Sequence, residues 1–273
     1  MKTVTLLAQC ILLVTLLVSP ASALSVPERL VYDVSWTGIN AGSAVMEVTA
    51  QGDELRLVNT IRSSGMVSTF FYIDDKTESV ISRGGLPRLH QKTIKEGSYR
   101  ARKEATFNFT TLRVETKDLL KKTEKTDAIS PRTYDSLSSI YFIRSSDLVP
   151  GRSIFFDIYD FKRLWKTEVR VVKREEITTP VGKFKTIMVV SQLKSDEVSA
   201  RVGDATFWFT DDSRRIPVRI KTKLKVGEVT LTLVHISQAS NPATSGGSIY
   251  LKKMTSVWLA SSAARHCLAP QNR

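Results

Sequence analysis

The side chains most often used in catalysis and metal binding are few and scattered in this sequence of 273 residues. There are three histidines, His90, His235 and His266, and none has a spacing such as H-E-x-x-H that places two imidazoles on one metal. Residues 191–194 (S-Q-L-K) match an S-x-x-K motif, but they end a β-type run instead of starting a helix. Neither phosphate-binding glycine motif is present. The sequence therefore predicts no catalytic residue, no metal site and no cofactor, and it leaves enzymatic activity open.

Adjacent acidic residues are the remaining candidates for acid–base chemistry. They include Asp74-Asp75, Glu175-Glu176 and Asp211-Asp212. Neighbouring side chains in a strand point to opposite faces, so adjacency does not bring two carboxylates into one site. Glycoside hydrolysis needs two carboxylates facing each other across a defined gap, which a sequence neither supplies nor excludes. A glycan hydrolase using Asp74, Asp75 and Glu78 is therefore one alternative function.

Large aromatic side chains gather in short runs at residues 70–72, 155–156 and 207–209. On a strand, such runs place large apolar groups on both faces. That pattern suits either core packing with pairs across strands or the wall of an apolar ligand cavity. We take six residues as the candidate lining of such a cavity: Trp36, Tyr141, Phe156, Trp165, Phe207 and Phe209.

Apolar and polar residues alternate over most of the chain, which is typical of antiparallel strands with one solvated face. The clearest alternating runs are residues 30–37, 55–62, 165–171 and 216–226. Turn-forming residues separate them, for example at 38–42, 51–53, 180–182 and 211–213. Runs joined by short turns are expected to pair with their neighbours in the sequence, so the pattern predicts a meander of sequential hairpins.

Residues 134–144 have helical spacing instead, with Leu137, Ile140 and Tyr141 on one stripe and Asp135 or Ser130 available as a cap. A long twisted sheet tends to curl. We therefore predict a mainly β fold. It would be a long curved antiparallel meander sheet, a half-barrel or roll, with this one helix packed on its concave face.

The first 23 residues have the pattern of a secretory signal peptide. Lys2 precedes an apolar run at residues 4–18, and the small residues Ala21-Ser22-Ala23 form a cleavage site. We expect cleavage after Ala23, with a lipid anchor at Cys10 as an alternative. The apolar run is shorter than the roughly 20 residues that a membrane-spanning helix needs. We therefore expect no stable transmembrane span after processing.

The remaining chain divides by composition near residue 240. Residues 24–240 are predicted to form a single β domain, and residues 241–273 a linker with a disordered tail. If the signal is removed, Cys267 is the one cysteine left, so no intrachain disulfide can form. The net charge of +13 favours contact with anionic surfaces such as phospholipid head groups, and it also serves solubility. Nucleic acid is not an expected partner of an exported protein.

Several motifs occur together in a fixed order: residues 30–36 with Ala41-Gly42, then 134–144, 148–151, 179–186 and 207–218. In this order they resemble the bacterial exported proteins grouped as domain-of-unknown-function family 3108. The resemblance covers residues 28–237 and implies a β protein of the periplasm or outer envelope with no assigned activity. It supplies no catalytic residue.

These observations favour a non-enzymatic protein of the periplasm, with association to the outer membrane left open. Its expected partners are a lipid, a lipoprotein acyl chain or another envelope protein, held against a concave apolar surface. The glycan hydrolase remains one alternative. A second is an interaction module whose edge strand accepts a strand from another chain. A basic row near the C-terminal end of the domain bears on it: Arg219, Lys221, Lys223 and Lys225.

Overall fold

The structure is a computed structural model that describes residues 24–194, 204–224 and 227–238. The predicted signal peptide at 1–23, the cysteines Cys10 and Cys267, and the predicted tail at 241–273 lie outside the described residues. These expectations stay predictions.

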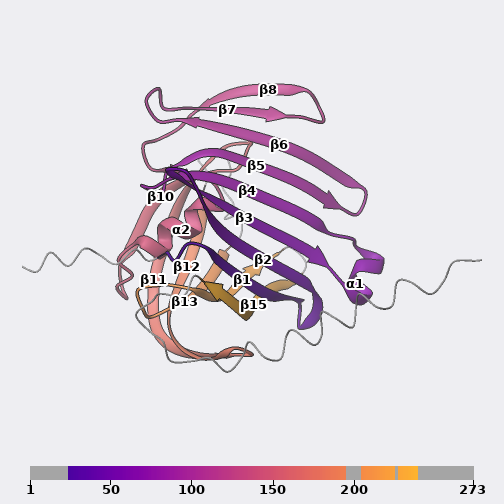
Figure 1. The fold of residues 1–273 in the computed structure, drawn as a ribbon, viewed down its shortest axis with the longest axis vertical. Coiled ribbons are helices and arrows are strands. Elements are labelled where there is room, and N and C mark those ends of the chain that lie inside the picture. The colour runs from indigo at the N-terminus through magenta and orange to yellow at the C-terminus, as the bar shows by residue number, and fades with distance from the viewer. Residues whose placement is uncertain (1–23, 195–203, 225–226, 239–273) are drawn as a thin grey trace, which may run out of the picture. The chain divides into compact units, whose positions relative to one another are not determined.

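Fifteen strands and two helices make up the described part of the chain (Figure 1). The first eight strands are β1 (Glu28–Trp36), β2 (Ile39–Gln51), β3 (Glu54–Ser63), β4 (Asp74–Ser82), β5 (Pro87–Glu96), β6 (Tyr99–Asn108), β7 (Arg113–Asp118) and β8 (Thr123–Ala128). The others are β9 (Thr133–Tyr134), β10 (Ser153–Tyr159), β11 (Leu164–Thr179), β12 (Gly182–Lys194), β13 (Asp204–Thr210), β14 (Pro217–Lys223) and β15 (Glu228–Gln238). The helices are α1 (Gly65–Phe70) and α2 (Ser138–Ser145).

All fifteen strands belong to one sheet, in the order β8-β7-β6-β5-β4-β3-β2-β1-β15-β14-β13-β12-β11-β10-β9. The order consists of two meanders that meet where β1 pairs with β15, residues Glu28 and Gln238 lying opposite each other. Every pairing is antiparallel except the short contact of β9 with β10. The predicted fold class, a curved antiparallel meander, is confirmed.

The alternation seen in the sequence becomes the two faces of this sheet. In β1, Leu30, Tyr32 and Val34 are buried and Asp33 is exposed. The buried residues of both meanders join one core with the inward side chains of α2, including Tyr141 and Ile143. The helix therefore packs inside the curve of the sheet, as predicted (Figure 1).

The two edge strands of the sheet, β8 and β9, are consecutive in the chain and are joined by residues 129–132 alone. The curl of the sheet brings β10 near β7 and β8, and side chains bridge these strands. Tyr159 on β10 shares an apolar cluster with Phe107 and Val114 of the other half. Its hydroxyl also contacts the Thr116 hydroxyl at 2.9 Å and donates to the Asp127 carboxylate.

The predicted helix at 134–144 begins four residues later, because Thr133 and Tyr134 pair with β10 as strand β9. Asp135, and not Ser130, satisfies the first N–H groups of α2. Its Oδ1 accepts hydrogen bonds from the Leu137 and Ser138 amides at 2.8 and 2.9 Å. Only one of the two proposed caps therefore acts on the helix.

The expectation of a single helix, with residues 70–72 on a strand, is wrong. Gly65 has a φ of 59°, a left-handed conformation that suits glycine, and it interrupts the extended chain after β3. The helix α1 follows, and none of its residues is buried. Because it has no buried face, α1 leaves no helical stripe of apolar residues in the sequence.

Gly42, where β2 leaves the β1–β2 turn, is required by the close approach of β3. A Cβ atom built on Gly42 would lie 2.0 Å from the Arg62 carbonyl oxygen, and the residue has a φ of 153°.

We expect Gly42→Ala to lower the free energy of unfolding by about 2–3 kcal/mol, because the backbone of β2 or β3 must move to admit the methyl group. Gly52→Ala is the control. Gly52 has open space around it, so only the left-handed penalty of about 1 kcal/mol applies. Urea unfolding measures both, and equal losses would contradict the steric explanation.

Candidate functional site

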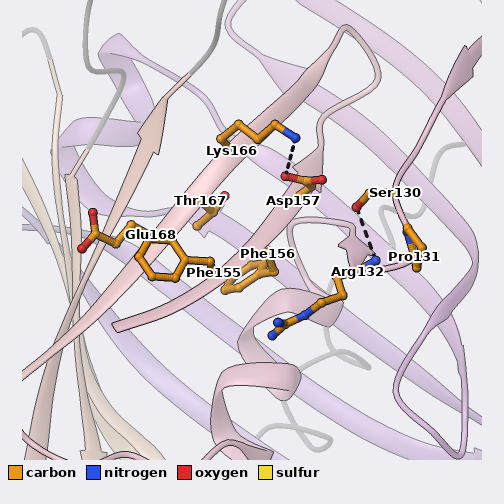
Figure 2. A pocket seen from close by; sticks show the side chains of 9 residues that line it. All are labelled: Ser130, Pro131, Arg132, Phe155, Phe156, Asp157, Lys166, Thr167 and Glu168. Atoms are coloured by element: carbon orange, nitrogen blue, oxygen red, sulfur yellow. Dashed lines mark hydrogen bonds and ion pairs between the residues drawn. The ribbon is translucent and has the colours of Figure 1, made fainter. Parts of the chain in front are cut away.

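An open hollow of about 540 Å³ lies where β10 runs beyond the short strand β9. Three elements line it: the β8–β9 connection at residues 130–132, strand β10 at Phe155, Phe156 and Asp157, and strand β11 at residues 166–168. Figure 2 shows the two phenylalanine rings and the Arg132 side chain around the same space. A volume of this size lies within the range of small-molecule sites.

Strand register explains which side chains reach the hollow. Phe155 lies opposite Glu168, and Phe156 lies opposite Thr167. Because successive residues point to opposite faces, Phe155 is turned outward and is 60% exposed. Phe156 is turned inward and is 4% exposed. The hollow lies beyond the end of β9, where β10 has no paired neighbour on that side among the described residues. Side chains from both faces of β10 therefore border it.

Phe156, which lines the hollow, belongs to a packed aromatic group. The Phe156 ring meets the Tyr134 ring edge-on at 5.7 Å and the Phe142 ring of α2 at 5.1 Å. Tyr134 and Phe142 stack at 4.4 Å. This contact ties the apolar wall of the hollow to the helix inside the sheet, which holds the wall in place.

The charged groups around the hollow are not equally paired. Asp157 forms an ion pair with Lys166 at 3.4 Å, and Glu168 accepts a hydrogen bond from the Ser153 hydroxyl at 2.9 Å. The Arg132 guanidinium lies over the Phe142 ring, 5.7 Å from its centre. Within the described residues, no carboxylate lies at ion-pair distance from it. The hollow thus combines an apolar wall with one cation available to an anion.

The acids proposed for glycan hydrolysis lie elsewhere, on β4. Asp74 borders a smaller polar hollow of about 380 Å³ with Arg62 and Lys95. Hydrogen bonds from Lys95 and Arg62 lower the pKa of the Asp74 carboxyl. Burial alone would raise the pKa of Glu78, but Lys76 and Arg56 outweigh it and lower the pKa. Both carboxyls are therefore held as paired anions, which does not favour either as a general acid.

A buried polar cluster, which sequence analysis did not find, joins β4, β5 and the start of α2. The Ser79 hydroxyl donates to Asp135 Oδ2 at 2.6 Å, and His90 Nδ1 lies 3.3 Å from Asp135 Oδ1. His90 also stacks on the Phe161 ring at 4.9 Å. Burial lowers the pKa of His90 and outweighs the opposite effect of Asp135. The serine contacts the aspartate and not the histidine, and all three are buried, so the cluster positions α2 and does not form a nucleophilic triad.

The structure brings together four of the six residues predicted to line an apolar cavity. Tyr141, Phe156, Phe207 and Phe209 belong to the main core, and Phe156 also borders the hollow. Trp165 is buried, and its indole N–H donates to Asp160 at 2.7 Å. Trp36 lies half-exposed beside the β1–β2 turn. Their role in binding stays a prediction.

Sequence analysis did not single out Phe155 or Arg132 for the hollow. The Phe155-Phe156 pair was a visible signal, since one of two adjacent strand residues must point outward. Arg132 had no such signal. It reaches Phe142 only because the β8–β9 connection joins the two edge strands of the sheet.

In the described part of the chain, no group of three or more His, Cys, Asp or Glu side chains could hold a metal. Neither described helix has the length and hydropathy needed to cross a bilayer.

Comparison with solved structures finds the same fold in a beta-barrel-like protein of domain-of-unknown-function family 1849 from Brucella abortus. The two share 14% identity with a TM-score of 0.59, over 79% of this chain and 99% of the other. A Bacteroides fragilis protein with a YmcC-like fold, provisionally described as exported, is 9% identical over 78% of this chain and 96% of its own. Its TM-score of 0.34 is too low to support an argument.

A comparison with curated protein sequences finds no match. One family model does match, over residues 31–234, which is most of the described sheet. It spans all five motifs from β1 to β14 on which the resemblance was based, apart from the first residue of the first motif. The chain therefore belongs to the family described as protein of unknown function DUF3108.

Proposed function

We propose that the protein is a non-enzymatic binding protein of the bacterial cell envelope. Its ligand would be an apolar chain with an anionic end, such as a fatty acid or the acyl chain of a lipid. The observation that carries the proposal is the hollow with Phe155 and Phe156 on its wall and the Arg132 guanidinium at its border. The predicted signal peptide and the resemblance of this chain to a family of bacterial exported proteins support the envelope location.

The chemistry of the hollow favours this ligand class over a sugar or a nucleotide. Phe155 is exposed beside the packed aromatic group of Phe156. A ligand with apolar groups would remove the Phe155 ring from water, which is favourable. The two carboxylates on the border, Asp157 and Glu168, already have partners. Arg132 is therefore the group that would take the anionic end, through a charge-assisted hydrogen bond.

Binding of a fluorescent fatty acid to the purified protein tests the proposal. Arg132→Gln removes the cation, and we expect about tenfold weaker fatty-acid binding, since a hydrogen bond to a charged group contributes about 1.5–3 kcal/mol. The fatty alcohol of the same length should bind equally well to both proteins. Phe155→Asp places a charge on the apolar wall and should weaken both probes. The control is Arg113→Gln, an exposed arginine on β7. The proposal fails if the protein binds neither probe or if both hollow variants bind as the wild type does.

A second candidate occupant is a strand from a partner protein. The Asp157 amide donates to the Arg132 carbonyl at 3.0 Å, so this side of β10 faces β9. Because β9 pairs only with Asp157 and Ile158, the same side of Phe155 extends beyond β9. An added strand could pair there, as in other edge-strand complexes. A photo-crosslinking residue at position 155 would distinguish the two in cells, because a partner protein gives an adduct of protein size and a lipid does not.

A further inference from the structure

Exposed apolar side chains concentrate in the turns at one end of the sheet. Thirteen large hydrophobic residues are exposed in the described part of the chain, and ten of them lie in five connections there or on the strand residues that border them. The connections are β1–β2, β3–β4 with α1, β5–β6, β7–β8 and β14–β15. The most exposed are Phe70 at 82% and Met66 at 75%, both on α1. Exposed hydrophobic residues that concentrate at one end of the sheet indicate a contact surface.

Backbone hydrogen bonds link several of these connections to one another or to a neighbouring strand. Thr37 donates to Glu228, which links the β1–β2 and β14–β15 turns. Gly97 donates to the Tyr72 carbonyl, and Leu119 donates to the Arg102 carbonyl. In Figure 1, α1 and the β5–β6 and β7–β8 turns follow one another along one side of the sheet. We call this surface the turn row and define it as residues 36–39, 62–76, 95–100, 117–124, 221–224 and 227–228.

The turn row is basic as well as apolar. Its sequence holds nine lysines and arginines against six acids, a net charge of +3. Most of these acids are engaged within the protein. Asp74 pairs with Arg62 and Lys95, Glu228 pairs with Lys221, and the Asp118 carboxylate accepts the Leu120 and Lys121 amides.

Four cations on the turn row are exposed and have no carboxylate partner among the described residues: Arg100, Lys121, Lys122 and Lys223. Lys121 and Lys122 directly follow the exposed Leu119 and Leu120. Exposed apolar side chains and these cations thus lie next to each other on the turn row. That combination matches a bilayer interface, where acyl chains and anionic head groups occur at neighbouring depths.

We propose that the turn row docks on an anionic phospholipid surface. The apolar tips of α1 and the β7–β8 turn would enter the head-group region, and the neighbouring lysines would pair with lipid phosphates. The chemistry of an anionic bilayer fits better than that of a partner protein, because the apolar residues occupy the tips of separate turns and do not form one flat patch. This proposal is independent of the hollow at Phe155, which lies on β10 and outside the turn row.

Co-sedimentation of the purified full chain, as the cell produces it, with vesicles tests the docking. The vesicles contain phosphatidylcholine alone or in equal parts with phosphatidylglycerol. We expect binding to the mixed vesicles only, weakened by high salt. Lys121→Gln/Lys122→Gln should reduce the affinity about twenty-fivefold, since each cation near an anionic surface contributes about a factor of five. Met66→Ser/Phe70→Ser should reduce it at least about tenfold.

The matched controls carry the same changes outside the turn row. Lys183→Gln/Lys185→Gln has the same loss of charge in β12, and Val172→Ser/Val181→Ser removes two exposed apolar side chains on and after β11. Both should bind vesicles within about twofold of the wild type. Equal binding to the two kinds of vesicle, or equal losses in row and control variants, would overturn the proposal. So would row variants that bind vesicles normally but lose a protein crosslink in cells, which would indicate a protein partner. Fatty-acid binding, measured without vesicles, reports separately on the hollow.

Discussion

Replacing Glu28 with alanine is expected to lower the free energy of unfolding by about 3–5 kcal/mol, because it leaves a buried guanidinium without its counter-ion. Glu28 and Arg144 form a two-point ion pair at 2.7 and 2.9 Å, with side chains that are 1% and 2% exposed. Gln238 also donates to Glu28, and Arg144 donates to the Arg214 carbonyl. One pair thus joins β1, α2, β15 and the turn before β14.

The electrostatics agree with a strongly coupled pair. Burial alone would lower the pKa of Arg144, but the hydrogen bonds and charge of Glu28 outweigh it and raise the pKa. The guanidinium therefore stays charged in the folded protein. Because arginine keeps its proton in proteins, deprotonation cannot relieve the loss of Glu28. Replacing both residues with methionine should give a protein more stable than either single variant, because no lone charge remains buried.

Urea unfolding followed by tryptophan fluorescence measures these changes. The control is Glu47→Ala, which removes the same side chain from an exposed pair with Arg29 at 3.1 Å. Exposed pairs contribute at most about 1 kcal/mol, so this variant should unfold close to the wild type. A loss for Glu28→Ala no larger than that of Glu47→Ala would contradict the role given to the buried pair.

The second large effect is expected at Asp135, the residue that fixes the start of α2. Asp135→Ala should lower the free energy of unfolding by at least about 3 kcal/mol, because the buried donors that it satisfies would lose their acceptor. These donors are the Leu137 and Ser138 amides and the Ser79 hydroxyl. Asp135→Asn keeps an oxygen for the two amides and should lose less.

Asp118→Ala is the matched control, because Asp118 also accepts two backbone amides, from Leu120 and Lys121, but in an exposed turn. Water can replace those bonds, so the expected loss is about 1 kcal/mol or less. Urea unfolding compares the three variants. Because α2 carries Phe142 under Phe156, Asp135→Ala should also weaken fatty-acid binding at the hollow. Unchanged stability in Asp135→Ala would show that the cluster does not hold the helix.

Much of the architecture could be predicted from local pattern. Alternation such as Leu30, Tyr32 and Val34 against Asp33 fixes which face of a strand is buried, because side chains alternate strictly along a strand. Short turns make neighbouring runs pair, which gave the meander. The helical stripe at residues 137–141 located α2. The one element predicted wrongly, α1, has no buried residue, and a helix without a buried face leaves no periodic signal.

The candidate site was much less predictable than the fold. Phe156 was named from its aromatic run, but Arg132 meets Phe142 only through the path of the β8–β9 connection. The buried cluster joins Ser79 to Asp135 across 56 residues of chain, and the ion pair joins Glu28 to Arg144 across 116. Nothing in local composition marks such partners, since each is an ordinary polar residue in its own strand, helix or turn.

By itself, the sequence determined the secondary structure of most of the chain and the buried face of each strand, because both follow from the period of hydrophobic residues. Only the tertiary structure decided that β1 pairs with β15 and that Tyr159 on β10 bonds to Asp127 on β8. That curvature depends on the twist of the whole sheet. It also decides which residues become neighbours at the hollow and which turns line up in the turn row, so both proposed binding surfaces are products of the curved sheet.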